Sequence, residues 1–136
     1  MKCRKQPPFL AGKPTPIEDV WEVHLVGAIW RYLAEIARRR KVSYSTIARY
    51  CIFRLAEQKN LKMTSSWQAV HQKNKAQIAG SGQLHRHLVC LYGEDVVLLK
   101  LAAIRLGITV SALIRLALVL YLPCLAMENH SKEIVD

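Results

Sequence analysis

The side chains best suited to chemistry in this sequence are basic, and the chemistry that they suit is the binding of anions. Lys and Arg number 20 against 10 Asp and Glu, which gives a formal net charge of +10 over 136 residues. The basic run Arg38 to Lys41 comes directly before an expected helix start, where backbone N–H groups and the helix dipole attract phosphate. The charge favours a polyanionic partner, either nucleic acid or an acidic membrane surface.

The other reactive side chains favour neither metal binding nor catalysis. His85 and His87 are two residues apart and share one strand face, but Cys90 falls on the opposite face. The four cysteines lack the spacing of a zinc site, so we expect reduced thiols in a cytoplasmic protein. No nucleophile and base, carboxylate pair or phosphate-binding glycine loop can be assembled. We therefore expect no enzyme activity, no cofactor and no metal site.

The elements that would hold the basic residues occur twice. Residues 20–55 align without a gap with residues 86–121, and eight of these 36 positions are identical where chance gives roughly two. The repeat indicates one structural unit used twice. The identical pairs are Val23/Val89, Leu25/Leu91, Gly27/Gly93, Leu33/Leu99, Ala37/Ala103, Arg39/Arg105, Ser45/Ser111 and Arg49/Arg115.

Each copy has the pattern of a strand followed by two helices. Apolar residues alternate over 21–25, which predicts a half-buried strand. A helix is expected over about 27–40, and a second over about 44–58 with Ser43 as its N-cap. In the second copy the last helix is expected over 110–122, capped by Thr109, with Pro123 stopping or kinking it. The predicted fold class is mainly α with a short two-stranded antiparallel ribbon, formed as a tandem pseudo-dimer.

The repeat also sets the expected division of the chain. Residues 59–83 are polar and end in Gly-Ser-Gly, the composition of a flexible tether, with a helix allowed over 66–78. No secretion signal is expected, and the apolar run 108–122 contains Arg115 and is shorter than the roughly 20 residues of a membrane span. The expected segments are a basic N-terminal arm (1–19), copy one (20–58), the tether (59–83), copy two (84–123) and a C-terminal tail (124–136).

The second helix of copy two opens with the segment Gly107-Ile108-Thr109-Val110-Ser111-Ala112-Leu113-Ile114-Arg115. This segment and its surrounding elements resemble the ribbon-helix-helix family of DNA-binding repressors. Copy one matches less closely, with Lys41 where the family usually has Gly. The resemblance covers about 72 residues. It implies that the two strands pair and lie in the DNA major groove. One unit alone cannot bury its apolar faces, so the copies are expected to fold together.

The resemblance and the strand alternation together give candidate DNA contacts. If the odd-numbered residues 21–25 point inward, the base contacts are Val20, Glu22, His24, Arg86, Leu88 and Cys90. The phosphate contacts are Lys2, Arg4, Lys5, Arg38, Arg39, Arg40, Lys41, Ser43, Ser45, Thr109 and Ser111. Two alternatives stay open: Glu22 pairs with Arg86 or His24 across the strands, and the basic run only complements a helix dipole.

These observations favour a sequence-specific duplex DNA-binding protein, either a transcriptional regulator such as a repressor or a plasmid or phage accessory factor. The last helix is apolar nearly all round, so we expect self-association through Leu113 to Met127, unless the tether or the tail folds over it. The rival hypothesis is a protein-interaction module, antitoxin-like or scaffold, with weak non-specific DNA affinity. A third hypothesis is peripheral attachment to an anionic membrane.

Overall fold

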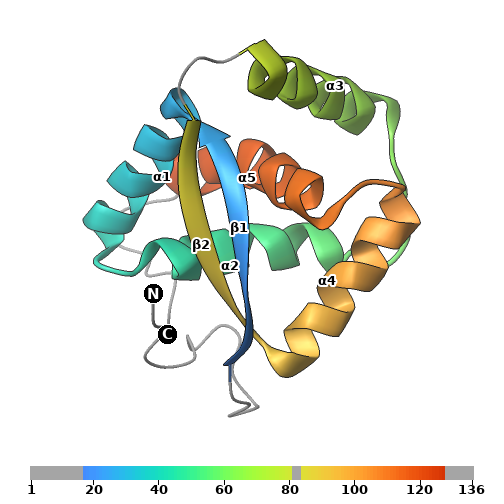
Figure 1. Ribbon diagram of the computed structural model, residues 1–136, viewed down its shortest axis with the longest axis horizontal. Coiled ribbons are helices and arrows are strands. Elements are labelled where there is room, and N and C mark those ends of the chain that lie inside the picture. Colours follow the sequence, from blue (N-terminus) through green and yellow to red (C-terminus); the bar gives the residue numbers. More distant parts are fainter. Residues whose placement is uncertain (1–16, 81–83, 128–136) are drawn as a thin grey trace.

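The chain forms helices and one two-stranded ribbon, as the repeat predicts. The computed structural model describes residues 17–80 and 84–127, and their side chains except those of residues 17–20, 85, 87, 92 and 127. The ribbon lies across α2 and α5, and α1 and α4 flank it on opposite sides (Figure 1). The predicted fold class is confirmed. The elements are β1 (Ile17–Val26), α1 (Gly27–Arg40), α2 (Tyr44–Ala56), α3 (Ser65–Gly80), β2 (Leu84–Tyr92), α4 (Gly93–Leu106) and α5 (Val110–Met127).

The two copies begin their helices at equivalent positions. α1 and α4 start at Gly27 and Gly93, and α2 and α5 start at Tyr44 and Val110, so both pairs lie 66 residues apart. The strands of the two copies pair with each other in an antiparallel register within the single chain. The sequence repeat is therefore a structural repeat, and each copy supplies the other's partner strand.

The turn between the helices has the same left-handed geometry in both copies. Lys41 has φ 58° and Gly107 has φ 70°. In each case the next residue donates its N–H to the carbonyl five residues earlier, at 3.1 Å. Gly adopts this region freely, whereas a residue with a Cβ adopts it at a cost of roughly 1–2 kcal/mol. Lys41 thus stands where copy two has Gly107, without changing the turn.

The core forms between the inner face of the ribbon and the second helices. Val23 and Leu25 on β1 and Leu91 on β2 are each at most 1% exposed, as the alternation predicts. α2 and α5 pack against each other beneath them, and Ile52 and Leu113 are fully buried there. Successive side chains of a strand point to opposite faces, so the residues between these buried ones lie on the outer face of the ribbon.

The segment expected to be a flexible tether is mostly helical. α3 extends over Ser65–Gly80, slightly beyond the allowed 66–78, and packs against α5 and β1 (Figure 1). Its apolar residues Trp67, Val70 and Ile78 are half-buried. This result supports the alternative in which the tether folds over the apolar last helix.

α5 continues through Pro123 to Met127, so of the two expected outcomes, a stop or a kink, the stop is wrong. Proline removes one backbone hydrogen bond from a helix. Leu122 and Leu125 on either side of it are 0% and 1% exposed, and burying two such side chains contributes about 3–6 kcal/mol. Burial in the core therefore outweighs the local preference of the sequence.

The open apolar face expected on α5 is found on another helix. None of the described large apolar side chains of α5 is exposed, since α2 and α3 cover them, so the reason for self-association through Leu113 to Met127 is removed. The exposed apolar residues instead include Val97, Leu101 and Ile104 on α4. No single helix in the described ranges is long and apolar enough to cross a membrane. α4 and α5 meet that test only as a pair bent by 88°.

Candidate nucleic-acid interface

The outer face of the ribbon presents a small polar cluster beside one apolar residue. Glu22 lies opposite Leu88 in the strand register, and His24 lies opposite Arg86, so each strand contributes two of the four side chains. All four are exposed. Nε2 of His24 lies 3.2 Å from Oε2 of Glu22, and Arg86 Nη1 donates to the same oxygen at 3.4 Å. Glu22 thus pairs with both candidate partners, and the cluster presents cationic and anionic groups together.

The ends of this face differ from the expectation. Cys90 pairs with Val20 in the register, but Cys90 is 1% exposed and forms a disulfide bond. A buried, oxidised sulfur cannot touch a base, so Cys90 is removed from the candidate base contacts. The expectation of reduced thiols is also wrong at this position, while Cys51 and Cys124 are free. The side chain of Val20 lies outside those that the structure describes.

The outer edge of β2 is covered by two side chains of α2. Ser45 Oγ donates to Leu88 O at 3.3 Å and accepts from Cys90 N at 3.2 Å, and Arg49 Nη1 donates to Cys90 O at 2.6 Å. An edge strand exposes backbone groups that need such partners. Ser45 is 2% exposed, so it is not available to a phosphate, which corrects its assignment.

The same arrangement recurs on β1, where Arg115 Nη1 lies 3.5 Å from His24 O. Residues 49 and 115 are equivalent in the repeat, and so are residues 90 and 24. Burial lowers the pKa of Arg115. Sequence analysis missed this role, although the identity of Arg49 and Arg115 across the repeat was its signal. Ser111, the counterpart of Ser45, is half-buried.

The consequence of these edge contacts is that the N-terminal turns of α2 and α5 flank the ribbon, one beside each strand. Ser43 Oγ accepts from Thr46 N at 3.1 Å, and Thr109 Oγ1 accepts from Ala112 N at 3.1 Å, so both predicted N-caps are confirmed. The first turn of a helix has further N–H groups without partners inside the helix, and these attract anions. Ser43 and Thr109 are both exposed at these two helix starts, one beside each strand of the ribbon.

The basic run lies at one of these two positions only. Arg38, Arg39 and Lys41 are exposed beside the N-terminus of α2, where an open groove of about 670 Å³ is lined by Arg31, Arg38, Ser43 and Tyr44, among others. Arg38 and Arg39 contact Glu35 at 2.6 and 3.4 Å, and the hydrogen bond from Arg38 lowers the pKa of Glu35. Exposed ion pairs of this kind are weak, so a phosphate can compete for the guanidinium groups.

Arg40 has a different use. Its Nη2 donates to the carbonyl of Leu125 at 2.9 Å, and the side chain is half-buried. The contact ties the end of α1 to the last turn of α5, where a cation also complements the helix dipole. Arg40 is thus a structural link rather than a free phosphate ligand. The remaining candidates Lys2, Arg4 and Lys5 lie outside the described residues.

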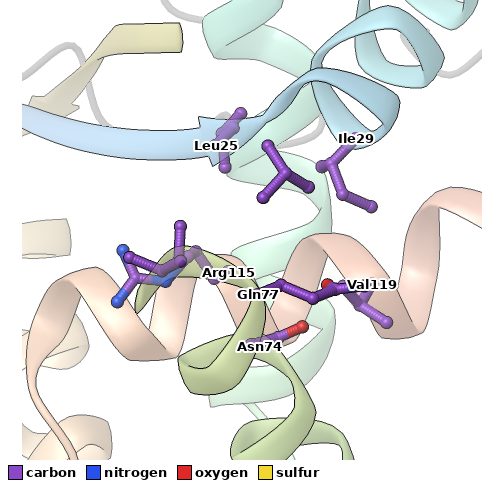
Figure 2. A pocket seen from close by; sticks show the side chains of 8 residues that line it. Leu25, Ile29, Asn74, Gln77, Arg115 and Val119 are labelled. Atoms are coloured by element: carbon purple, nitrogen blue, oxygen red, sulfur yellow. The ribbon is translucent and has the colours of Figure 1, made fainter. Parts of the chain in front are cut away.

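A small cavity under α3 is too small for an effector. The cavity lies between β1, α1, α3 and α5 (Figure 2). It is lined by Leu25, Ile29, Asn74, Gln77, Arg115 and Val119, among others. Its volume is about 10 Å³, roughly the space of one water molecule. Asn74 Nδ2 is buried there without a hydrogen-bond partner. In the described ranges, no group of His, Cys, Asp and Glu could hold a metal ion.

Comparison of the chain with protein-family models, with curated proteins and with solved structures finds no match. The geometry of the ribbon and its flanking helix ends is therefore the basis for assigning a function.

Proposed function

We propose that the protein binds duplex DNA, with the outer face of the ribbon in the major groove. One observation supports this most directly: an exposed two-stranded ribbon is flanked on both edges by helix N-termini, in a chain of net charge +10. A two-stranded ribbon fits the width of the major groove. The helix ends would then meet the phosphate backbone on either side and fix the register.

The polar cluster would supply sequence preference. Arg86 can donate two hydrogen bonds to guanine, and Glu22 can accept from cytosine N4, each good contact being worth about 1–3 kcal/mol. In the free protein these two side chains are paired with each other at 3.4 Å. A base pair that satisfies both groups repays the loss of this pair, whereas other base pairs leave the Glu22 carboxylate close to DNA without a donor. The role that follows is regulation by occupancy, as in a repressor or an accessory DNA-binding factor.

The first test is fluorescence anisotropy of the full chain with labelled generic duplex DNA over a salt series. Each phosphate contact contributes about −0.9 to the slope of log affinity against log salt. We expect the triple variant Arg38→Ala/Arg39→Ala/Lys41→Ala to make this slope shallower by about 3. The matched control, Lys59→Ala/Lys62→Ala/Lys73→Ala, removes the same charge from exposed positions on the loop before α3 and on α3 itself. No binding of the wild type at low salt would reject the proposal.

The second test separates base contacts from phosphate contacts. Against sites selected from a random duplex library, Arg86→Ala should lose preference at one base position and bind other sequences nearly as before. Glu22→Gln keeps the shape but removes the repulsive charge, so it should bind non-specific DNA more tightly and discriminate less. Uniform losses on every sequence in both variants would contradict base recognition by this cluster.

A further inference from the structure

The solvent-facing side of α4 is apolar along its length. Val97, Leu101 and Ile104 are 59%, 52% and 74% exposed and follow one another at intervals of four and three residues. Residues at this spacing lie on one face of a helix. They form a stripe, called here the α4 stripe, on the side opposite the buried residues Val96 and Leu99.

The equivalent face of α1 is charged, which shows that the fold does not need the α4 stripe. Positions 97, 101 and 104 correspond to Arg31, Glu35 and Arg38 in the repeat. Arg38 and Glu35 form an exposed ion pair there. The same backbone position therefore has an ordinary solvated surface in one copy and an uncovered apolar surface in the other. Contiguous exposed apolar surface is typical of interaction sites.

We propose that the α4 stripe is the contact through which two copies of this chain associate, with their α4 helices antiparallel about a two-fold axis. The stripe is nearly symmetric about its middle residue, so Leu101 of one copy meets Leu101 of the other, and Val97 meets Ile104. An isologous contact requires a surface that is complementary to itself in this way.

The distribution of charge also favours α4 as the contact and an antiparallel arrangement of the two helices. A chain of net charge +10 repels its own copies, and α1 contributes four Arg and one Glu to that repulsion. α4 instead has two acidic and two basic residues, so it is locally neutral. Its acidic residues are in the first turn and Arg105 is in the last. Antiparallel packing sets the acidic end of one helix beside the basic end of the other and also opposes the helix dipoles.

The association should stop at two copies. Only one of the two equivalent helix faces in each chain is apolar, so a dimer through α4 leaves the charged α1 faces outward. If the proposed DNA binding also holds, the dimer presents two identical ribbons related by the two-fold axis. Each ribbon has two unlike strands, so the DNA site is an inverted pair of asymmetric half-sites. The association itself does not depend on DNA, so the two proposals can fail separately.

The test is sedimentation equilibrium of the full chain without DNA, from micromolar to millimolar concentration. The wild-type mass should rise from 15.5 kDa towards twice that value. The triple variant Val97→Arg/Leu101→Glu/Ile104→Arg, which copies the charged residues of α1, should remain at the monomer mass with an unchanged circular dichroism spectrum. A wild type that stays monomeric, or a folded triple variant that still dimerises, would overturn the proposal.

The reciprocal exchange tests whether association stops at two copies, and cysteine cross-linking tests whether the two α4 helices are antiparallel. Arg31→Val/Glu35→Leu/Arg38→Ile gives α1 its own stripe and should convert the dimer into larger, open assemblies. Under mild oxidation Leu101→Cys should form a covalent dimer well above the wild-type level, whereas Ile104→Cys alone should not. Strong cross-linking of Ile104→Cys with none of Leu101→Cys would contradict the antiparallel arrangement. The salt series on the monomeric triple variant tests DNA binding independently.

Discussion

α1 and α4 have the same length and the same place beside the ribbon, yet their outer faces differ completely. In α1 this face and the following turn are basic and lie beside a helix N-terminus. In α4 the face is apolar and nearly neutral. Four of the eight residue pairs that the copies share are buried apolar residues, and another pair, Arg49 and Arg115, contacts the strand edges. The repeat thus preserves the fold, while the outer faces of its two copies differ in chemistry.

The contacts at the strand edges show a smaller difference between the copies. Arg49 is 1% exposed and its bond to Cys90 O is 2.6 Å long, whereas Arg115 is half-buried at 3.5 Å from His24 O. A buried carbonyl without a donor is costly, and an exposed one can bind water. The two equivalent arginines should therefore contribute unequally to stability.

The largest expected effect is on Arg49. Arg49→Ala leaves Cys90 O unpaired in the core together with a cavity, and should lower the free energy of unfolding by about 2–4 kcal/mol. Arg115→Ala should cost about 1 kcal/mol or less. Arg49→Met keeps most of the volume, so it separates the hydrogen bond from packing. If urea unfolding shows equal losses of unfolding free energy for the two alanine variants, the expected difference between the two strand edges is contradicted.

An intermediate effect is expected at the left-handed turns. Lys41→Gly should stabilise the protein by about 0.5–1 kcal/mol, because glycine adopts φ 58° without the cost of a Cβ. Gly107→Ala should destabilise it by about 1 kcal/mol. A Cβ at Gly107 would meet no atom within 4 Å, so the cost comes from the backbone alone. Thermal unfolding without DNA measures both, and changes of the same sign would contradict the explanation.

The smallest effect concerns pH and the packing of α3. Burial lowers the pKa of His71 from 6.5, and Lys75 on α3 and Arg115 on α5 lower it further. The unfolded chain then takes up a proton more readily than the folded one, so stability is retained above about pH 6.5 and falls as the pH drops below it. His71→Gln should flatten this part of the curve of unfolding free energy against pH. An unchanged curve would assign the pH dependence to other groups.

Sequence reasoning was most successful where local rules decide the structure. The bounds of α1 and the caps at Ser43 and Thr109 follow from short-range hydrogen bonds and backbone preferences. The antiparallel pairing of the two strands was also expected, but its register was not. These features determined the fold class and placed Glu22, His24, Arg86 and Leu88 on one exposed face.

It was less successful where the structure depends on contacts between distant residues. Ser45 was assigned to phosphate because it lies near a helix start, but Leu88 and Cys90, more than 40 residues away, determine its position. α5 continues through Pro123 because Leu122 and Leu125, on either side of it, are buried in the core. A strand pattern cannot show that Cys90 is covered, because alternation gives the face of a side chain but not what packs on it.

The ordered α3 that joins the two copies has a consequence for a protein present in few molecules. Ribbons assembled from separate chains dissociate on dilution, because their formation follows mass action. Here both strands belong to one molecule, so their pairing is governed by an effective concentration that dilution does not change. The ribbon stays assembled at any copy number, and each strand can change its own outward residues without imposing the same change on the other.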